Sequence, residues 1–180
     1  MDFHRSLPPN ALIGGGNDEK EAFFKGLTIK EVRMAQVEGI NLPDELYYHP
    51  DDHLWVRIEG TRATVGLNDL AQRSAGAVNA VRLKPPGRPI AKGKPFGTME
   101  AGKYVGPLRA PISGNVIEIN PEVMNRPGLL NLDPYGKGWL IIIEPENAAR
   151  DLPDLVHGDA TQTWLEKTIA DWRKRGLLKA

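Results

Sequence analysis

Lys103 is the residue with the clearest chemical potential, because its amine is expected to stand on a tight turn between two strands. Residues 95–100 and 107–110 are short extended runs, and Gly102 directly precedes the lysine. Glycine adopts positive φ without steric cost, so the chain can reverse direction there. A lysine at such a tip points away from the sheet. Its amine is then available for covalent attachment of a carried group, or it is simply solvated, and the surrounding sequence must decide between these readings.

The sequence around Lys103 resembles the lipoyl-lysine hairpin of the glycine-cleavage H-protein family. In that family the motif Glu-Ser-Val-Lys is followed, at a fixed interval, by Pro-(Val/Ile)-Ser-Gly. This chain has Glu100-Ala-Gly-Lys103 and then, after residues 104–110, Pro111-Ile-Ser-Gly114. The spacing matches without a gap. The resemblance implies that lipoate is covalently attached to Lys103.

The resemblance continues on both sides and covers roughly residues 43–172. Each further motif is weak alone, but together they occur in the family's order and register. They are His53-Leu-Trp55-Val, Ala63-Thr-Val-Gly66, Ala71-Gln72, Gly76, Pro127-Gly-Leu-Leu-Asn131, Pro134-Tyr-Gly136, Gly138-Trp139-Leu140 and Ile141-Ile-Ile-Glu-Pro145.

Glu100 is the second candidate site residue. In lipoyl proteins an acidic residue at this position, before the lysine, helps the modifying ligase to recognise the hairpin, and the resemblance implies the same role here. The alternative is an ordinary carboxylate at the end of a strand. Biotin is the rival cofactor for a hairpin lysine, but biotin-accepting hairpins resemble Met-Lys-Met, whereas Lys103 lies between Gly102 and Tyr104.

A lipoyl arm on Lys103 would extend a dithiolane ring about 10 Å or more beyond the backbone. The ring is a cyclic disulfide that nucleophiles open and that can be reduced and reoxidised. The chain has no cysteine, so its redox chemistry would have to come from an attached group. We therefore expect a carrier rather than an enzyme, with no catalytic residue and no metal site of its own.

Three departures from the family bear on what the arm carries. In aminomethyl-carrying H-proteins a glutamate occupies the position of Leu54 and a histidine that of Ser74, and the two hold the amine of the carried group. Replacing the glutamate by leucine removes the counter-charge for an ammonium group. Arg109 also places a cation after the lysine, where the family often has acidic or neutral residues.

These departures favour a relative of the H-protein with different cargo. The lipoate-binding proteins of the heterodisulfide-reductase-like sulfur-oxidation pathway are similar in this respect, so the first hypothesis is a carrier of a sulfur intermediate that works with that complex. The second is the aminomethyl carrier of the glycine cleavage complex, with partners that include a flavin dihydrolipoyl dehydrogenase. Both readings require a lipoate ligase or lipoyl-transfer enzyme. The third, from another class, is an unmodified interaction module.

Composition limits other functions. The 180-residue chain balances 23 Lys and Arg against 23 Asp and Glu, so net charge indicates neither nucleic acid nor membrane as a partner. The absence of a signal sequence and of a long apolar run predicts a cytoplasmic protein. His49 and His53 are read as a surface pair rather than metal ligands, because a third strong ligand is missing. Four basic residues are interpreted as part of a solvated face rather than as a binding patch: Arg62, Arg82, Lys84 and Arg88.

Short apolar runs separated by turn residues predict a mainly β fold, with 15 prolines and 19 glycines scattered between them. Such strands favour a small sandwich or flattened barrel, and the resemblance implies a lipoyl-type barrel-sandwich hybrid of two antiparallel sheets. The expected strands are residues 53–58, 61–65, 78–83, 95–100, 107–110, 115–119 and 139–143.

Helices are expected between and around these strands. Asn68 or Asp69 can cap a short helix that ends at Gly76, and Asp159 can cap a C-terminal helix over about residues 161–175. Residues 18–39 predict one or two amphipathic helices, which either pack on their own domain or dock a partner. The predicted organisation is an N-terminal extension, flexible and then helical (1–40), an H-protein-like domain (41–150), and a C-terminal helix packed on it (151–180).

Overall fold

The computed structural model describes residues 33–102 and 104–178, and each strand pairing in this part of the chain is antiparallel. The strands are β1 Met34–Val37, β2 Ile40–Pro43, β3 Tyr47–Tyr48, β4 Leu54–Glu59, β5 Arg62–Leu67, β6 Val78–Leu83, β7 Arg88–Ile90, β8 Pro95–Ala101, β9 Tyr104–Arg109, β10 Gly114–Ile119, β11 Trp139–Pro145 and β12 Val156–His157.

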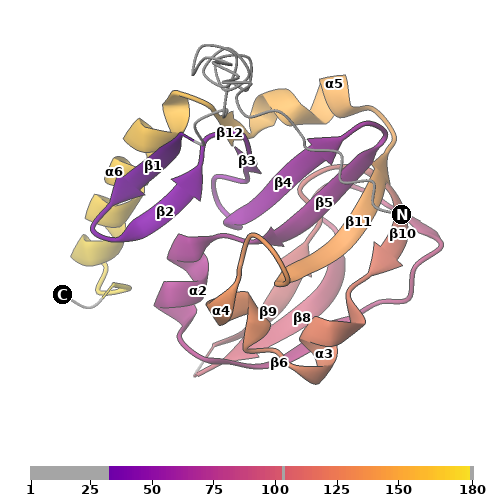
Figure 1. The fold of residues 1–180 in the computed structure, drawn as a ribbon, viewed down its shortest axis with the longest axis horizontal. Helices are drawn as coiled ribbons and strands as arrows, with labels where there is room; N and C mark the ends of the chain where they lie inside the picture. Colours follow the sequence, from indigo (N-terminus) through magenta and orange to yellow (C-terminus); the bar gives the residue numbers. More distant parts are fainter. Residues whose placement is uncertain (1–32, 103, 179–180) are drawn as a thin grey trace, which may run out of the picture. The chain divides into compact units, whose positions relative to one another are not determined.

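Two sheets form the body of the described residues (Figure 1). A seven-stranded sheet has the order β12–β3–β4–β5–β11–β10–β7, and a three-stranded sheet has the order β6–β8–β9. The short hairpin β1–β2 makes a third, two-stranded sheet. The predicted mainly β fold with antiparallel sheets is therefore confirmed.

The helices lie between and after these strands. They are α2 Asp69–Ala75, α3 Pro121–Asn125, α4 Leu129–Leu132, α5 Ala148–Asp151, the 3₁₀ turn η1 Leu152–Asp154, and α6 Ala160–Lys174. The short helices α3 and α4 lie in the segment between β10 and β11. Asn120 caps α3 by accepting a hydrogen bond from the Glu122 amide.

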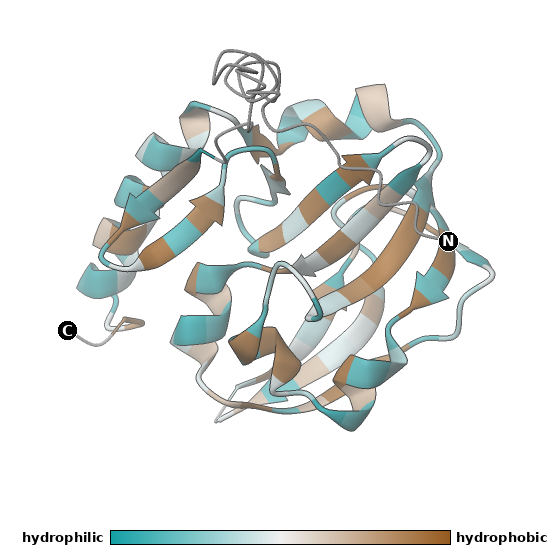
Figure 2. Ribbon diagram, in the orientation of Figure 1, coloured by the Kyte–Doolittle hydropathy of each residue, from teal (hydrophilic) through white to brown (hydrophobic). Residues whose placement is uncertain are grey.

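The main hydrophobic core joins the seven-stranded sheet to the three-stranded sheet. Ile141 and Ile143 of β11, Val65 of β5 and Met99 and Ala101 of β8 all belong to one buried cluster. Figure 2 shows β11 as an almost continuous hydrophobic strand. Leu140, Ile141 and Ile143 are buried, whereas Ile142 is only half-buried, so the unbroken apolar sequence does not correspond to complete burial on both faces. Burying each large aliphatic side chain contributes about 1.5–3 kcal/mol, so this core fixes how the sheets face each other.

A second core lies on the other side of β4, under the hairpin β1–β2 and helix α6. Trp55 of β4, Leu42 of β2 and Leu165 and Ile169 of α6 are buried together there. The predicted C-terminal helix is thus confirmed, and it packs through a face that includes Leu165 and Ile169. Asp159 is its N-cap residue but makes no side-chain capping bond; its carboxylate instead lies 3.6 Å from Arg33.

The helical prediction for residues 18–39 is wrong at its C-terminal end, where Met34–Val37 form strand β1. The reason is the turn that follows. Glu38 and Gly39 both have positive φ, at 55° and 80°, which is the conformation of a tight two-residue hairpin turn. That turn pairs Val37 with Ile40 and places Ala35 in the second core. The rest of the predicted N-terminal helices lies outside the described residues.

Because Gly66 has no side chain, the ring of Trp55 on the neighbouring strand can pack directly against its backbone. The two residues are paired across β4 and β5, and a Cβ on Gly66 would lie 2.4 Å from Trp55 Cε2. We expect Gly66→Ala to destabilise the fold by about 1–3 kcal/mol, because the buried indole has to move to relieve the overlap. Urea unfolding of the variant tests this. Gly60→Ala is not a suitable control, since Gly60 has positive φ, whereas Gly128→Ala meets no atom within 4 Å and is expected to change stability little.

Candidate functional site

The hairpin β8–β9 has a register that makes Gly102 and Lys103 a two-residue turn. Glu100 is paired with Val105, and Ala101 with Tyr104. Gly102 has φ +55°, which suits glycine at such a turn. Strand β9 begins at Tyr104, earlier than the predicted residue 107, because Tyr104–Gly106 continue the ladder with β8. Lys103 itself lies outside the described residues.

The side chains that follow the turn are open to solvent. Tyr104 is 50% exposed and Val105 is 71% exposed. The Tyr104 ring lies against Gly106, where a Cβ would come 2.2 Å from the phenolic oxygen. A protein that modifies or uses a group attached in this turn can therefore approach it, and the neighbouring residues fit covalent attachment of an arm.

Glu100 points to the outer face of the three-stranded sheet, while Met99 and Ala101 on either side of it point into the core. Its side chain is 39% exposed, and its carboxylate lies 3.4 Å from Arg82 Nη1 on β6. An exposed pair of this kind contributes little stability, at most about 1 kcal/mol. The carboxylate therefore remains accessible, and its role in recognition by a ligase stays a prediction.

Helix α2 lies beside the turn. A Cβ on Gly102 would come 3.3 Å from the Ala75 carbonyl oxygen at the end of this helix. Asn68 caps the helix by accepting a hydrogen bond from the Ala71 amide at 2.9 Å, and Gly76 ends it with φ +79°. Both features agree with the sequence prediction, and α2 ends beside Gly102 of the turn.

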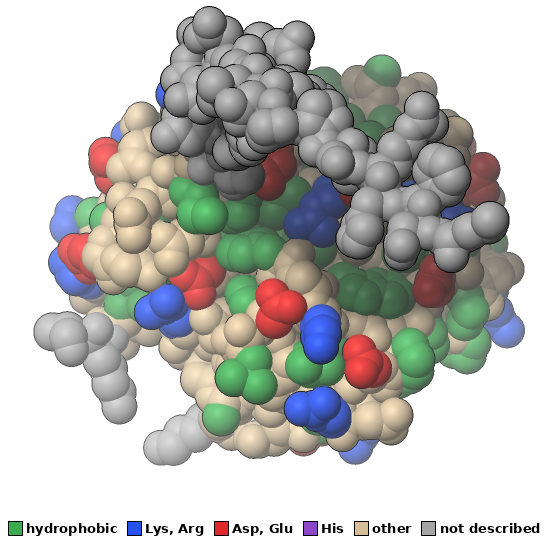
Figure 3. Space-filling model, in the orientation of Figure 1, with side chains coloured by type: hydrophobic (Ala, Val, Ile, Leu, Met, Phe, Trp, Pro, Cys, Tyr) green, Lys and Arg blue, Asp and Glu red, His purple; other side chains and the backbone are tan. Residues whose placement is uncertain are grey.

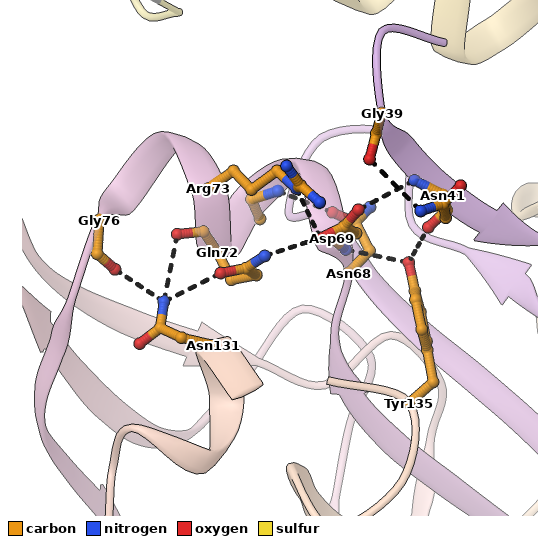
Figure 4. Close-up of polar contacts among 10 residues, drawn as sticks. Gly39, Asn41, Asn68, Asp69, Gln72, Arg73, Gly76, Asn131 and Tyr135 are labelled. Atoms are coloured by element: carbon orange, nitrogen blue, oxygen red, sulfur yellow. Dashed lines mark hydrogen bonds and ion pairs between the residues drawn. The ribbon is translucent and has the colours of Figure 1, made fainter. Parts of the chain in front are cut away.

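A buried polar network fixes α2 to its surroundings (Figure 4). The Asp69 carboxylate accepts hydrogen bonds from the backbone N–H of Asn41 at 2.9 Å, from Gln72 Nε2 at 2.7 Å and from Arg73 Nε at 2.9 Å. The Tyr135 hydroxyl accepts one from the Asp69 amide and donates one to the Asn41 carbonyl. Burial is the largest of the factors that raise the pKa of Tyr135 above its usual range, so this hydroxyl stays protonated.

Asn131 joins the other end of α2 to β6. Its Nδ2 donates to Gln72 Oε1 and to the Gly76 carbonyl, both at 2.9 Å, and its Oδ1 accepts from the Val78 amide at 2.9 Å. The sequence motifs around Asn131 and Tyr135 thus act in positioning the helix beside the turn. In the sequence these motifs indicate only the family and not this structural role.

Leu54 and Ser74 occupy the two positions at which aminomethyl carriers have a glutamate and a histidine. Leu54 is 1% exposed and belongs to the main core, paired across the sheet with Leu67. The Ser74 hydroxyl donates a hydrogen bond to the Leu177 carbonyl at 3.0 Å. Neither side chain offers a charge to a group carried on an arm.

His53 is a buried group rather than a surface one, so the prediction of a surface pair with His49 is wrong for it. It is 7% exposed, and its ring lies between Trp164, stacked at 5.5 Å, and Trp172, edge-on at 4.6 Å. Its Nδ1 atom is buried without a hydrogen-bond partner. His49 differs, since its Nδ1 accepts from the Asp52 amide at 3.1 Å.

This burial makes the stability of the fold depend on pH. Burial, opposed by Asp51 and assisted by His49, lowers the pKa of His53 to about 4, against about 6.5 in an unfolded chain. Between these values the unfolded chain binds the extra proton, so stability falls as the pH falls. We expect a loss of about 3 kcal/mol from this group between pH 7 and pH 4. Asparagine tolerates the φ of +55° at this position. Urea unfolding of His53→Asn at several pH values should therefore show a shallower decline than the parent protein; an equally steep decline contradicts this reading.

Within the described residues, no cluster of three or more His, Cys, Asp or Glu side chains is arranged to bind a metal ion. In the same part of the chain, no helix combines the length and apolar character that crossing a membrane requires.

Comparison with known proteins gives a consistent result. Residues 46–168 match the family model described as glycine cleavage H-protein. Glycine cleavage system H protein 3 of Aquifex aeolicus is 39% identical over 141 residues, covering 76% of this chain and 88% of that protein. Probable glycine cleavage system H protein 2 of Sulfurisphaera tokodaii is 42% identical over 139 residues, covering 76% and 93%. The crystal structure of a glycine cleavage system H protein from Mycobacterium marinum aligns with a TM-score of 0.61 at 27% identity, covering 71% of this chain and 98% of that one.

Proposed function

The chain belongs to the glycine cleavage H-protein family, whose members carry a covalently attached lipoate on a lysine, and we propose that Lys103 is the attachment site in this protein. The observation that carries the proposal is the register of β8 and β9, which leaves only Gly102 and Lys103 in the turn. The exposed side chains of Tyr104 and Val105 support it, because a modifying enzyme needs access. Glu100, on the outer face, is assigned the weaker role of helping that enzyme to recognise the hairpin.

When bound, the lipoyl group supplies a disulfide that can be opened, reduced and reoxidised. The chain's own residues would present it. The antiparallel ladder of β6, β8 and β9 holds the turn at the end of a rigid sheet, and the network of Asp69, Tyr135 and Asn131 fixes the helix beside it. The protein thus acts as a carrier subunit, with the chemistry performed by the enzymes that it visits.

We further propose that the arm serves the glycine cleavage complex, as the aminomethyl carrier. The relatives named above are glycine cleavage system H proteins, which favours this reading over the sulfur-carrier reading. The partners would be a lipoate ligase or lipoyl-transfer enzyme and the glycine cleavage enzymes, including the flavin dihydrolipoyl dehydrogenase, in the cytoplasm. We retain the division into an extension (1–40), a carrier domain (41–150) and a C-terminal helical segment (151–180) as part of this proposal.

Glycine–bicarbonate exchange tests this assignment. The lipoylated protein is mixed with the glycine decarboxylase of the same organism, and incorporation of labelled bicarbonate into glycine is measured. We expect exchange that depends on the lipoylated chain and is absent with the unmodified one. No exchange above that of the decarboxylase alone, with fully lipoylated protein, would contradict the role in glycine cleavage.

A sulfur-carrying role is the second candidate, and one observation favours it. Leu54 lies in the core where aminomethyl carriers have a glutamate, and Ser74 is bonded to the Leu177 carbonyl. An ammonium group on the arm would find no counter-charge at either position. The heterodisulfide-reductase-like complex would then be the partner. Failure of glycine–bicarbonate exchange together with sulfur transfer to or from the lipoylated chain supports this second reading, and robust exchange removes it.

A further inference from the structure

Positive charge is concentrated in the part of the chain that forms the three-stranded sheet. Residues 70–117 contain eight Lys or Arg side chains and one acidic side chain, Glu100, although the whole chain has 23 of each sign. This segment includes all of β6, β7, β8 and β9. The face seen in Figure 3 instead mixes acidic and basic side chains. Of these eight side chains, Arg82 and Arg109 belong to described strands of the three-stranded sheet and Lys84 directly follows β6, whereas Arg73 and Lys92 are paired with Asp69 and Asp154. The remainder of this basic segment therefore lies mainly at the three-stranded sheet.

The basic side chains of this sheet lie on its outer face. Arg82 alternates with the buried Val81 on β6, and Arg109 follows the buried Leu108 on β9. Lys84 Nζ donates to the Pro95 carbonyl at 2.7 Å, and Arg109 Nη1 donates to the Gly93 carbonyl at 3.3 Å. Neither Lys84 nor Arg109 makes an ion pair with another described residue. Their charge is available to a partner.

Apolar side chains lie on the same sheet closer to the turn. Val105 is paired with Glu100 on the outer face and is 71% exposed, whereas Tyr104, which is 50% exposed, is paired with the core residue Ala101 and borders the turn from the other face. Exposed apolar groups bordered by charged ones are the usual arrangement of a protein–protein interface, with an apolar centre and a polar rim. This arrangement favours a protein partner over nucleic acid, whose binding surfaces follow the phosphate backbone with cations.

We propose that the basic outer face, defined as Arg82, Lys84, Val105 and Arg109, docks the enzyme that lipoylates Lys103, and that this enzyme presents an acidic surface to it. The inference rests on the proposed function. The enzyme must cover the residues beside Lys103, because the neutral amine has to attack the acyl carbon of adenylated lipoate; an amide bond forms, adenylate leaves and the amine loses its proton to water. An interface of ordinary size, about 800 Å² on each partner, extends from the turn over the neighbouring strands.

The test uses the lipoate–protein ligase of the same organism and the unmodified full-length chain. Initial rates of lipoylation give kcat/KM at several salt concentrations, from low ionic strength upward. Two double variants change the charge of the face in steps. The neutralised variant combines Arg82→Gln with Arg109→Gln, and the charge-reversed variant combines Arg82→Glu with Arg109→Glu. The matched control is Arg126→Glu with Lys167→Glu, since both residues are exposed cations outside residues 70–117.

Electrostatic steering raises association rates by about 10-fold to 1,000-fold, so we expect kcat/KM to fall about tenfold in the charge-reversed variant. The neutralised variant should fall by an intermediate factor, the control should stay within about twofold, and the differences should shrink as salt screens the charges. The loss should lie in KM, with complete lipoylation at long times. A change no larger than that of the control overturns the proposal.

Two further outcomes have defined meanings. If the parent chain is never lipoylated, even with excess ligase, the proposed function itself fails. If the ligase kinetics are unchanged by charge reversal while a short DNA duplex binds the parent chain and not the reversed variant, the face belongs to nucleic acid and the docking proposal is wrong.

Discussion

Replacing Leu54 with glutamate is expected to destabilise the protein by about 4 kcal/mol, because it places a carboxylate in the main core without a partner. Leu54 is 1% exposed and is paired with Leu67, which is itself buried. The free energy of unfolding in urea, compared with that of the parent protein at pH 7, measures the effect. The position also bears on the proposed function, since the family resemblance implies a glutamate there in aminomethyl carriers.

Leu54→Met is the matched control for this prediction. Methionine has a similar volume and no charge, so it should cost less than about 1.5 kcal/mol. If the free energy of unfolding of Leu54→Glu instead lies within about 1 kcal/mol of that of the parent, the side chain at position 54 must reach water or a cleft. In that case Leu54→Glu combined with Ser74→His would be expected to increase aminomethyl carriage, and the reading of Leu54 as a core residue would be wrong.

Replacing Lys103 with arginine is expected to abolish lipoylation completely while the fold is retained. Arginine keeps the positive charge, but its guanidinium stays protonated and does not form the amide. Lipoylation is followed by the intact mass of the full-length chain after incubation with ligase, ATP and lipoate. Urea unfolding of the variant should match the parent within about 0.5 kcal/mol, as for other surface substitutions.

Lys94→Arg is the control for this second prediction, since Lys94 is an exposed lysine just before β8. This variant should accept one lipoyl group at the rate of the parent chain. Continued modification of Lys103→Arg, or loss of modification in Lys94→Arg, would move the attachment site away from the turn.

Much of the fold followed from local sequence signals. The strands that enclose the main core have alternating or continuous apolar residues with turn residues between them, and Asn68 and Gly76 mark the ends of α2 as predicted. The strand at Met34–Val37 was missed because its apolar residues also fit a helical period. What decides the strand is the turn at Glu38 and Gly39, where both residues have positive φ. That turn forms together with the pairing of β1 and β2, which the local sequence alone does not reveal.

The turn of the candidate site could be predicted from the sequence, but the contacts around the turn could be predicted only in part. The spacing from Glu100 to Gly114 identified the turn because hairpin motifs are local. The contact of the turn with the end of α2 joins residues 75 and 102, and the Asp69–Tyr135 network joins residues distant in sequence. Such contacts depend on how the sheets pack. For the same reason His53 was read as a surface group, although α6 covers it from the far end of the chain.

The most direct test is the location of the lipoyl group in the full-length chain after lipoylation. Trypsin does not cleave after a modified lysine or between Lys94 and Pro95, so attachment to Lys103 leaves a single peptide, residues 93–109, that carries the added mass. We expect this peptide and the disappearance of the separate peptides 93–103 and 104–109. An unmodified pair of peptides, or added mass on any other lysine, would contradict the assignment of Lys103 as the carrier residue.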